Sequence, residues 1–405
     1  MSGFLINVAF YIIPVIVVVG VVITVHEFGH FLAAKALGTK IDQFSVGFGK
    51  PIAHWTDKSG VEWRIGWLPI GGFVRFAGDD NAASVPDQDG LEDLRRDLIA
   101  REGETALGQY YHFKPIWQRA VISAAGPFAN FALSIAIFAG VLMALGEPIS
   151  AARIAKVFPN TPAAAAGFQK NDVIVEADGR PVKSFETVRE RIILRTGVPI
   201  TFVVNRGGQH VVLNATPVRG PVTDAVGHKH SLGTIGIGFA DLPQDHQTIH
   251  YGPIAALGAG VGRTADVIQT TVFYIGRMVT GRESADQISG PLGMAQISGD
   301  LTKQTADISK DLASFALNAF LTVLLLVANI SVGIGFLNLM PIPVLDGGHL
   351  LFYAYEAVAR RPLAAKVQAV GYRVGLALVL GLMLFATVND LQRLRVFNFI
   401  GGLFS

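Results

Sequence analysis

"VVITVHEFGHFLAAKALG", residues Val21–Gly38, places two histidines and a glutamate at the end of a long apolar segment. Residues 1–25 contain no aspartate, glutamate, lysine or arginine, so the surroundings of the motif resemble lipid more than water. Ionisable groups are costly inside a membrane and are retained mainly where they serve a function. The motif therefore predicts a membrane helix that carries a functional site.

The spacing of the two histidines suits a metal. His26 and His30 are four residues apart, which puts both imidazoles on one face of a helix. Such a pair can bind one Zn²⁺, and Glu27 between them can act as the general base of a hydrolytic reaction. The structural alternative is that both histidines are hydrogen-bonded interior groups at the end of a helix.

The composition agrees with a membrane protein. Of 405 residues, 51% are hydrophobic and 16% are charged, whereas soluble domains carry about 25% charged residues. The formal net charge of +2 gives no electrostatic reason to expect nucleic acid as a partner. The absence of cysteine excludes disulfides, a thiolate zinc site and a cysteine nucleophile.

Four apolar segments are long enough to cross a membrane, for which a helix needs about 20 residues. They lie at about 4–37, 120–146, 312–345 and 367–389. The first lacks the basic start and the cleavage site of a signal peptide, so it is predicted to be a retained span. We therefore predict a polytopic α-helical membrane protein with about four transmembrane helices.

The regions between the spans predict β structure. Residues 44–77 alternate apolar and polar residues and are rich in glycine, which is typical of short strands and turns. The charged stretch 79–104 predicts an exposed loop or a short helix. Residues 148–220 form a predicted compact soluble module with one helix around 185–195. Residues 221–311 are less distinctive, apart from a candidate amphipathic helix at 254–280.

A catalytic zinc has three protein ligands, and Asp346 is the candidate for the third. It is the only carboxylate within residues 312–355. Pro341 and Pro343 interrupt the helix before it, and such a break at membrane depth is tolerated only where it lines a cavity or is buried in protein. The alternative is an ordinary aspartate at a helix end. We leave His349 out of the metal set because a histidine in that position is more often structural.

The number of predicted spans between the two motifs places them on the same side of the membrane. The histidine pair ends the first span and Asp346 follows the third, while the second span returns the chain between them. Both therefore face the same leaflet. The positive-inside tendency places the loops after these spans in the cytoplasm, and the N-terminus and residues 148–311 outside. The basic residues of those loops are Lys40, Lys50, Lys58, Arg64, Arg75, Arg360, Arg361 and Lys366.

Two asparagines lie in otherwise apolar segments. Asn338 could hydrogen-bond a substrate backbone near the metal, or it could bond a neighbouring helix. Asn130 in "GPFANF" has the same ambiguity. Gly126 and Pro127 before it favour close helix packing. The sequence leaves both asparagine roles open.

Three motifs in order, "HEFGH", "AAGPFANF" and "NLMPIPVLDGG", resemble the site-2 protease family of intramembrane zinc metalloproteases. The similarity is greatest to the bacterial regulator-of-sigma-E protease type and covers nearly the whole chain. The resemblance implies that His26, His30 and Asp346 bind zinc and that Glu27 is the catalytic base. It also implies that Asn338 helps to hold the unwound substrate strand.

The resemblance further assigns the regions outside the spans. The strands at 44–77 are similar to the family's membrane-associated β-hairpin, which presents an edge to the substrate. "TPAAAAGFQKNDVIVEADGRPV" is similar to a bacterial PDZ domain, a module that takes an extended peptide as an added strand. In this family it faces the periplasm and filters substrates. Only one such domain is predicted here, at 148–220, whereas the enteric members carry two in tandem.

The implied partners are the lipid bilayer, a peptide ligand of the PDZ domain and single-span membrane proteins, either anti-sigma factors or remnant signal peptides. The implied location is the bacterial inner membrane, with the active site near the cytoplasmic side. The predicted organisation in chain order is transmembrane helix 1 (1–38), hairpin region and loop (39–115), transmembrane helix 2 (116–147), PDZ domain (148–220), connecting region (221–311), transmembrane helix 3 with the Asp346 motif (312–350), and a loop, transmembrane helix 4 and tail (351–405).

Two other functions use the same residues. A catalytically inactive membrane scaffold bearing a PDZ domain predicts that Glu27→Gln has no phenotype. A metal transporter could use the same histidine and aspartate ligands, because intramembrane ligands mark ion paths as well as active sites. A transporter needs neither an acid between two histidines nor a peptide-binding module, and metal flux into vesicles would identify one.

Overall fold

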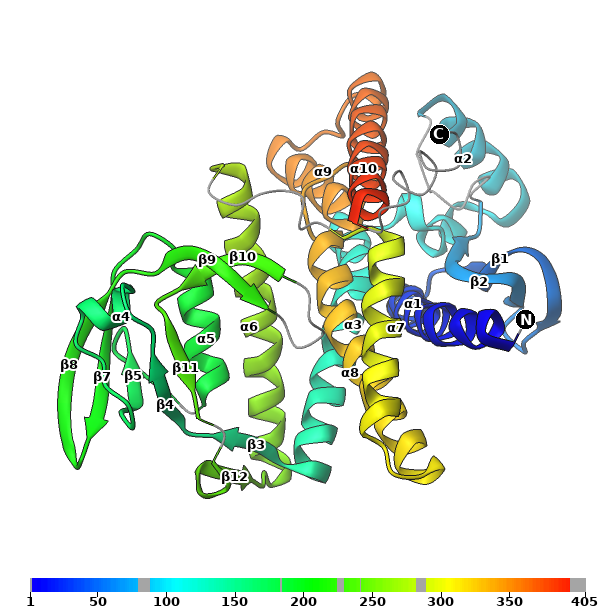
Figure 1. Ribbon diagram of the computed structural model, residues 1–405. Helices are drawn as coiled ribbons and strands as arrows, with labels where there is room; N and C mark the ends of the chain where they lie inside the picture. The colour runs from blue at the N-terminus through cyan, green and yellow to red at the C-terminus, as the bar shows by residue number, and fades with distance from the viewer. Residues whose placement is uncertain are drawn as a thin grey trace, which may run out of the picture. The chain divides into compact units, whose positions relative to one another are not determined.

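The computed structural model of this chain describes residues 2–78, 88–182, 184–223, 229–240, 242–281 and 289–393. The chain divides into two compact units. One, mainly helical, comprises Met1–Phe138, Ala259–Val272 and Met278–Ser405. The other comprises Ala139–Gly258 and Phe273–Arg277 and contains most of the strands in Figure 1. We call them the helical unit and the β-rich unit. The predicted tail beyond residue 393 and the loop 79–87 lie outside the described residues.

In the described chain, four helices are long and apolar enough to cross a membrane, as the four apolar segments predicted. They are α1 (Ser2–Ala36), α3 (Ile116–Leu145), α8 (Leu312–Asn338) and α10 (Ala365–Arg393). Large apolar side chains remain exposed along them, such as Val374 at 61% and Leu384 at 66% on α10. Exposed apolar surface of this extent suits contact with lipid.

Further helices complete the helical unit. α1 packs against α7 (Pro291–Ile308) and α8, and α7 also contacts α8 and α10. α9 (Asp346–Ala359) follows a short non-helical turn after α8. The predicted boundary at 350 is therefore wrong, because it falls inside α9. The candidate amphipathic helix is α6 (Pro253–Val279), whose residues are divided between the two units.

A long hairpin joins α1 to the next helices. β1 (Ile41–Thr56) pairs antiparallel with β2 (Glu62–Phe76), in a register that places Ile41 opposite Phe76. The predicted short strands are thus two long irregular ones. Their inner side chains, including Phe44 and Val74, pack against Phe31 of α1 in one hydrophobic cluster. This packing fixes the hairpin against the helix that carries the two histidines.

The segment between the hairpin and α3 caps the end of α1. It contains α2 (Gln88–Glu102) and two short 3₁₀ helices, η1 (Glu104–Gln109) and η2 (Tyr111–Phe113). The buried Lys114 donates hydrogen bonds of 2.8 Å to the carbonyl oxygens of Leu37 and Gly108. A lysine at a helix C-terminus satisfies carbonyl groups that have no partner within the helix.

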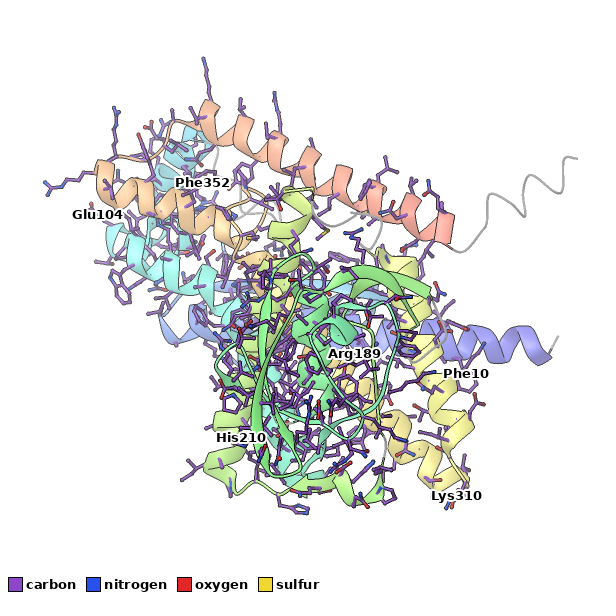
Figure 2. All side chains as sticks on the ribbon, turned by 60° about the vertical axis from the view of Figure 1, so that its left-hand side comes forward. Phe10, Glu104, Arg189, His210, Lys310 and Phe352 are labelled. Carbon is purple, nitrogen blue, oxygen red and sulfur yellow. The ribbon has the colours of Figure 1, made fainter. Side chains whose placement is uncertain are left out.

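The β-rich unit is built on an antiparallel sheet in the order β11-β4-β5-β7-β8, with β6 paired to β5. Its core contains the buried side chains of Ile154, Ile174, Phe202 and Val188. In Figure 2, Arg189 marks helix α5 and His210 marks strand β8. The bounds are β4 (Ala152–Val157), α4 (Pro162–Ala165), β5 (Val173–Ala177), β6 (Arg180–Pro181), α5 (Phe185–Leu194), β7 (Ile200–Arg206), β8 (Gln209–Ala215) and β11 (Ile237–Phe239).

The strands of the β-rich unit extend beyond the predicted module boundary at residue 220. β11 pairs with β4, and β12 (His246–Ile249) pairs with β3 (Glu147–Ser150). A second hairpin, β9 (Val218–Thr223) and β10 (Lys229–Thr234), precedes β11, and the 3₁₀ turn η3 (Pro243–Asp245) lies between β11 and β12. These short strands have no strong period-2 pattern, so their pairing depends on the tertiary fold.

Candidate metal centre

Two imidazoles on α1 form one side of the candidate metal centre. His26 and His30 lie one helical turn apart, and their Nε2 atoms are 3.2 Å from each other. Only 7% of His26 is exposed. The rings therefore point in a common direction, as the four-residue spacing predicts.

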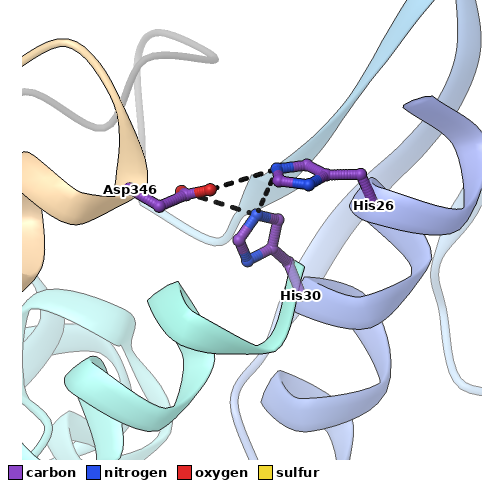
Figure 3. Close-up of side chains that lie close together, drawn as sticks. All are labelled: His26, His30 and Asp346. Atoms are coloured by element: carbon purple, nitrogen blue, oxygen red, sulfur yellow. Dashed lines mark hydrogen bonds and ion pairs between the residues drawn. The ribbon is translucent and has the colours of Figure 1, made fainter. Parts of the chain in front are cut away.

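Asp346 forms the other side, as Figure 3 shows. Its Oδ2 lies 3.1 Å from Nε2 of His26, and its Oδ1 lies 3.5 Å from Nε2 of His30. One donor atom from each residue lies within 4.8 Å of the others. The structure therefore brings together the three residues that the sequence predicted as ligands. Among the described residues they make up the one cluster of this kind, and His349 is not part of it.

The turn before α9 explains how Asp346 reaches the histidines. α8 ends at Asn338, the chain turns through Pro341 and Pro343, and Asp346 is the first residue of α9. Gly347 and Gly348 are buried, and a Cβ on either would overlap the backbone of residues 339–343. The two glycines allow the turn to fold tightly against the start of α9, so both prolines and both glycines have a structural reason.

α3 supports the histidines from behind. A Cβ on Gly29 would lie 2.7 Å from Cβ of Ala129, so α1 and α3 cross at small residues. A Cβ on Gly126 would overlap the ring of His30. Nδ1 of His30 donates to the carbonyl oxygen of Ile122 at 2.8 Å. This bond places the ring proton on Nδ1 and leaves a lone pair on Nε2, the atom that faces Asp346.

Asn130 lies on the same helix and is completely buried. Its Nδ2 is 3.3 Å from Nδ1 of His26. The backbone carbonyl oxygen of Asn130 accepts hydrogen bonds of 3.0 Å from the hydroxyl groups of Ser134 and Ser331. Close packing, which the sequence favoured for this segment, is therefore accompanied by a polar contact to a candidate ligand.

The three residues lie in a cavity of about 680 Å³ within the helical unit. Glu27 lines it, and its Cγ would lie 3.5 Å from a Cβ on Gly72 of β2, so its side chain lies against the hairpin. Asn338 also lines it, and its side chain has no hydrogen-bond partner among the described residues. All five residues predicted for the site thus border one cavity.

The cavity includes polar residues that the sequence did not single out for the site. Tyr111, Tyr372 and Arg373 line it, and His349 lies 3.4 Å from the hydroxyl of Tyr372 through Nδ1. The hydroxyl groups of Tyr111 and Tyr353 are 2.7 Å apart, and burial raises the pKa of Tyr111 well above its ordinary value. Tyr111 therefore remains a hydrogen-bond donor. A tyrosine in a short connecting segment carries no sequence signal of such a position.

Comparisons with known proteins identify a family and several full-length relatives. The model of peptidase family M50 matches residues 14–382. Metalloprotease MmpA of Caulobacter vibrioides is 46% identical over 405 residues and covers 100% of both chains. A predicted zinc metalloprotease of Agrobacterium fabrum is 42% identical over 393 residues, which are 97% of this chain and 98% of that protein. Among solved structures, the PDZ domain of the SdrC-like protein of Listeria monocytogenes is 21% identical, and the match covers 22% of this chain and 87% of that domain with a TM-score of 0.19. The chain belongs to peptidase family M50, the site-2 protease family that its three motifs resemble.

Proposed function

We propose that this chain is an intramembrane zinc metalloprotease that hydrolyses a peptide bond within transmembrane segments of other proteins. The observation that carries the proposal is the convergence of His26, His30 and Asp346 beside Glu27 in one cavity. The histidines lie on a helix apolar enough to cross a membrane, and Asp346 follows another. Membership of the M50 family supports the metalloprotease class.

The three side chains fit zinc. Two imidazole nitrogens and one carboxylate oxygen are ligands of catalytic zinc sites, in which three protein ligands leave one position open. The hydrogen bond from His30 to Ile122 leaves Nε2 of His30 unprotonated, as a ligand requires. His26, His30 and Asp346 would hold the ion. A bound zinc ion supplies Lewis-acid chemistry, which acidifies water and polarises a carbonyl group.

Glu27 is the proposed general base. It follows His26 directly in the chain, and its side chain lines the cavity that the three candidate ligands border. β2 lies against its side chain at Gly72, where a Cβ would be 3.5 Å from Cγ of Glu27, and so limits the directions in which the carboxylate can point. A general base placed in this way removes a proton from the attacking water and contributes about 10²- to 10⁴-fold to the rate.

The β1–β2 hairpin is the proposed substrate-binding element. A helical substrate must unwind before hydrolysis, because its carbonyl groups are hydrogen-bonded within the helix. Val74 and Phe76 of β2 line the cavity, so an extended segment added along the hairpin would pass the candidate ligands. Asn338 has an amide group free to bond the substrate backbone.

The surface of the hairpin supports contact with the membrane. Ile52 is 72% exposed and Trp67 is 60% exposed. Exposed large apolar and aromatic side chains are typical of segments that lie in the membrane interface. We therefore propose that the hairpin is membrane-associated.

We further propose a multi-pass protein of the bacterial inner membrane, with the active site near the cytoplasmic side. The β-rich unit is the proposed periplasmic PDZ domain, since its antiparallel sheet has β11 as one edge strand to which an extended peptide could add. Substrates would be single-span membrane proteins, either anti-sigma factors or remnant signal peptides, in regulated intramembrane proteolysis.

The decisive experiment measures cleavage of a panel of single-span substrates by the purified chain in detergent. Wild type is compared with Glu27→Gln, and zinc content is assayed on both. We expect cleavage by wild type alone, with zinc retained in both proteins. Equal cleavage by the two would point to a contaminating protease and would refute the role of Glu27. Zinc binding without cleavage of any substrate would direct the next measurement to metal flux into vesicles.

A further inference from the structure

Asn130 carries a hydrogen-bonding group that the proposed reaction does not use. Its side chain is 0% exposed, on an apolar helix. Nδ2 lies 3.3 Å from Nδ1 of His26, while Oδ1 has no hydrogen-bond partner among the described residues. A buried polar atom without a partner is rare and costly, so a polar asparagine at this position needs a physical reason.

The reason follows from what each candidate ligand requires. A neutral imidazole that binds a metal through Nε2 carries its proton on Nδ1, and that N–H needs an acceptor. His30 has such an acceptor in the carbonyl oxygen of Ile122. Nδ1 of His26 faces the amide of Asn130 instead. If the amide nitrogen donates there, Nδ1 must accept, and the proton of a neutral His26 lies on Nε2, which cannot then bind a metal.

The amide can satisfy the requirement in its other orientation. Rotation by 180° about the last side-chain bond exchanges the oxygen and the nitrogen with almost no change in shape. No hydrogen bond to Oδ1 holds the amide against this rotation. In the rotated orientation, Oδ1 accepts from Nδ1–H of His26 and leaves the Nε2 lone pair facing Asp346.

We infer that Asn130 is a positioning residue for the metal ligand His26: its amide oxygen holds the imidazole in the Nδ1–H form, as the carbonyl of Ile122 does for His30. The inference rests on the proposed function, because it takes His26, His30 and Asp346 as the zinc ligands. It gives both imidazoles their acceptors from the same helix, one from the backbone and one from a side chain.

The packing around Asn130 fixes the turn of α3 that carries its side chain. Ser134 and Ser331 donate to the backbone carbonyl oxygen of Asn130, so this turn of α3 is bonded to α8. A Cβ on Gly335 of α8 would lie 3.2 Å from Cβ of Asn130. Groups that orient metal ligands need this kind of fixed placement, because a small displacement misaligns the ligand.

The test measures the zinc dissociation constant of the purified full-length chain in detergent, by competition with a chromophoric chelator. Asn130→Leu removes the acceptor and is expected to weaken zinc binding about 10- to 100-fold, the usual effect of removing a group that orients a ligand. Asn130→Asp keeps an acceptor in the same place and is expected to retain most of the affinity. Thr302→Ala is the control, since it removes a buried hydrogen bond, to the carbonyl oxygen of Ser298 within α7, that involves neither His26 nor Asn130.

A merely structural role gives a different pattern. Asn130→Leu would then bind zinc as tightly as wild type, or Asn130→Asp would lose as much affinity as Asn130→Leu. Either result overturns the inference. Should the variants not fold, ¹⁵N-histidine NMR of the zinc-loaded wild type decides. A His26 ring proton on Nδ1 is expected, and coordination of zinc through Nδ1 would refute it.

Failure of the proposed function is distinguishable from failure of this inference. If the wild-type chain binds no zinc, or if His26→Ala leaves the zinc affinity unchanged, the proposed metal site is refuted, and the inference fails with it. Wild-type zinc binding that is lost in His26→Ala but unchanged in Asn130→Leu removes only the role of Asn130.

Discussion

Gly126 of α3 lies directly against the imidazole of His30 on α1, where a Cβ would overlap the ring at Nε2. That nitrogen is the atom that faces Asp346. The lack of a side chain at Gly126 is therefore what allows α3 to approach the candidate metal centre and to hold the other ring nitrogen of His30 through the carbonyl of Ile122.

Gly126→Ala is expected to push the His30 ring away from Asp346 and to weaken zinc binding about 10- to 100-fold, the range found when the surroundings of a ligand are disturbed. Zinc affinity of the purified protein is the measurement. Gly140→Ala is the matched control, because Gly140 lies on the same helix and a Cβ there meets open space. Equal zinc affinity in the two variants would contradict the contact.

Asn338→Ala is expected to lower the efficiency of cleavage without loss of zinc. One hydrogen bond to the substrate contributes about 1 kcal/mol, or roughly fivefold in kcat/KM. Kinetics on a single-span substrate, with zinc content measured alongside, test this. Asn329→Ala is the control, since Asn329 is an exposed residue of the same helix whose amide bonds only the carbonyl of Leu325 among the described residues. Loss of zinc in Asn338→Ala would instead indicate a role in the metal site.

Lys114→Met is expected to lower the thermal stability of the helical unit. The substitution leaves the carbonyl groups of Leu37 and Gly108 without their donor, and an unsatisfied buried acceptor costs about 1–3 kcal/mol. Thermal unfolding in detergent, followed by tryptophan fluorescence, measures the change. Lys35→Met serves as the comparison because Lys35 is an exposed lysine in the last turn of α1, the helix whose end Lys114 caps. A Tm for Lys114→Met equal to that of Lys35→Met would argue against the cap.

The β-rich unit is expected to lose stability in acid through Asp245. Hydrogen bonds of 2.7 Å from Arg153 hold the pKa of Asp245 below its ordinary value, with a smaller effect from the nearby charge of His246. A depressed pKa stabilises the fold above the unfolded-state value of about 3.9, and this stabilisation is lost as the pH falls through the folded-state pKa.

Amide hydrogen exchange of β4 and β12, corrected for the intrinsic rate at each pH, measures this effect. Wild type is expected to lose protection against amide exchange as the pH falls below about 4. Asp245→Asn is expected to be less protected at neutral pH and to show a smaller acid-dependent loss. The same acid-dependent loss in both proteins would show that other carboxylates are responsible.

Local sequence patterns were sufficient for much of this molecule. The four long helices follow from long, mainly apolar segments, because a chain in lipid must satisfy its backbone groups within each helix. The common direction of His26 and His30 follows from helical spacing alone. The break before Asp346 follows from Pro341 and Pro343, which cannot continue a helix.

Other parts of the fold could not be predicted in this way. The β-rich module was expected to end at residue 220, but β11 and β12 pair with strands that lie far earlier in the chain. Short edge strands carry little periodic signal, and their partners are chosen by packing. The third span with the Asp346 motif was predicted to extend to 350 and to be followed by a loop, whereas a separate helix, α9, runs from Asp346 to Ala359.

The sequence by itself determined which residues of this protein can bind a metal and which helices carry them, because the identity and spacing of side chains along a helix are local properties. Only the tertiary structure decided that Gly126 meets His30, that Asn130 faces His26 and that Gly72 lies against Glu27. These contacts join segments far apart in the chain, and they depend on where helices cross and how a hairpin packs, which no spacing within one segment specifies.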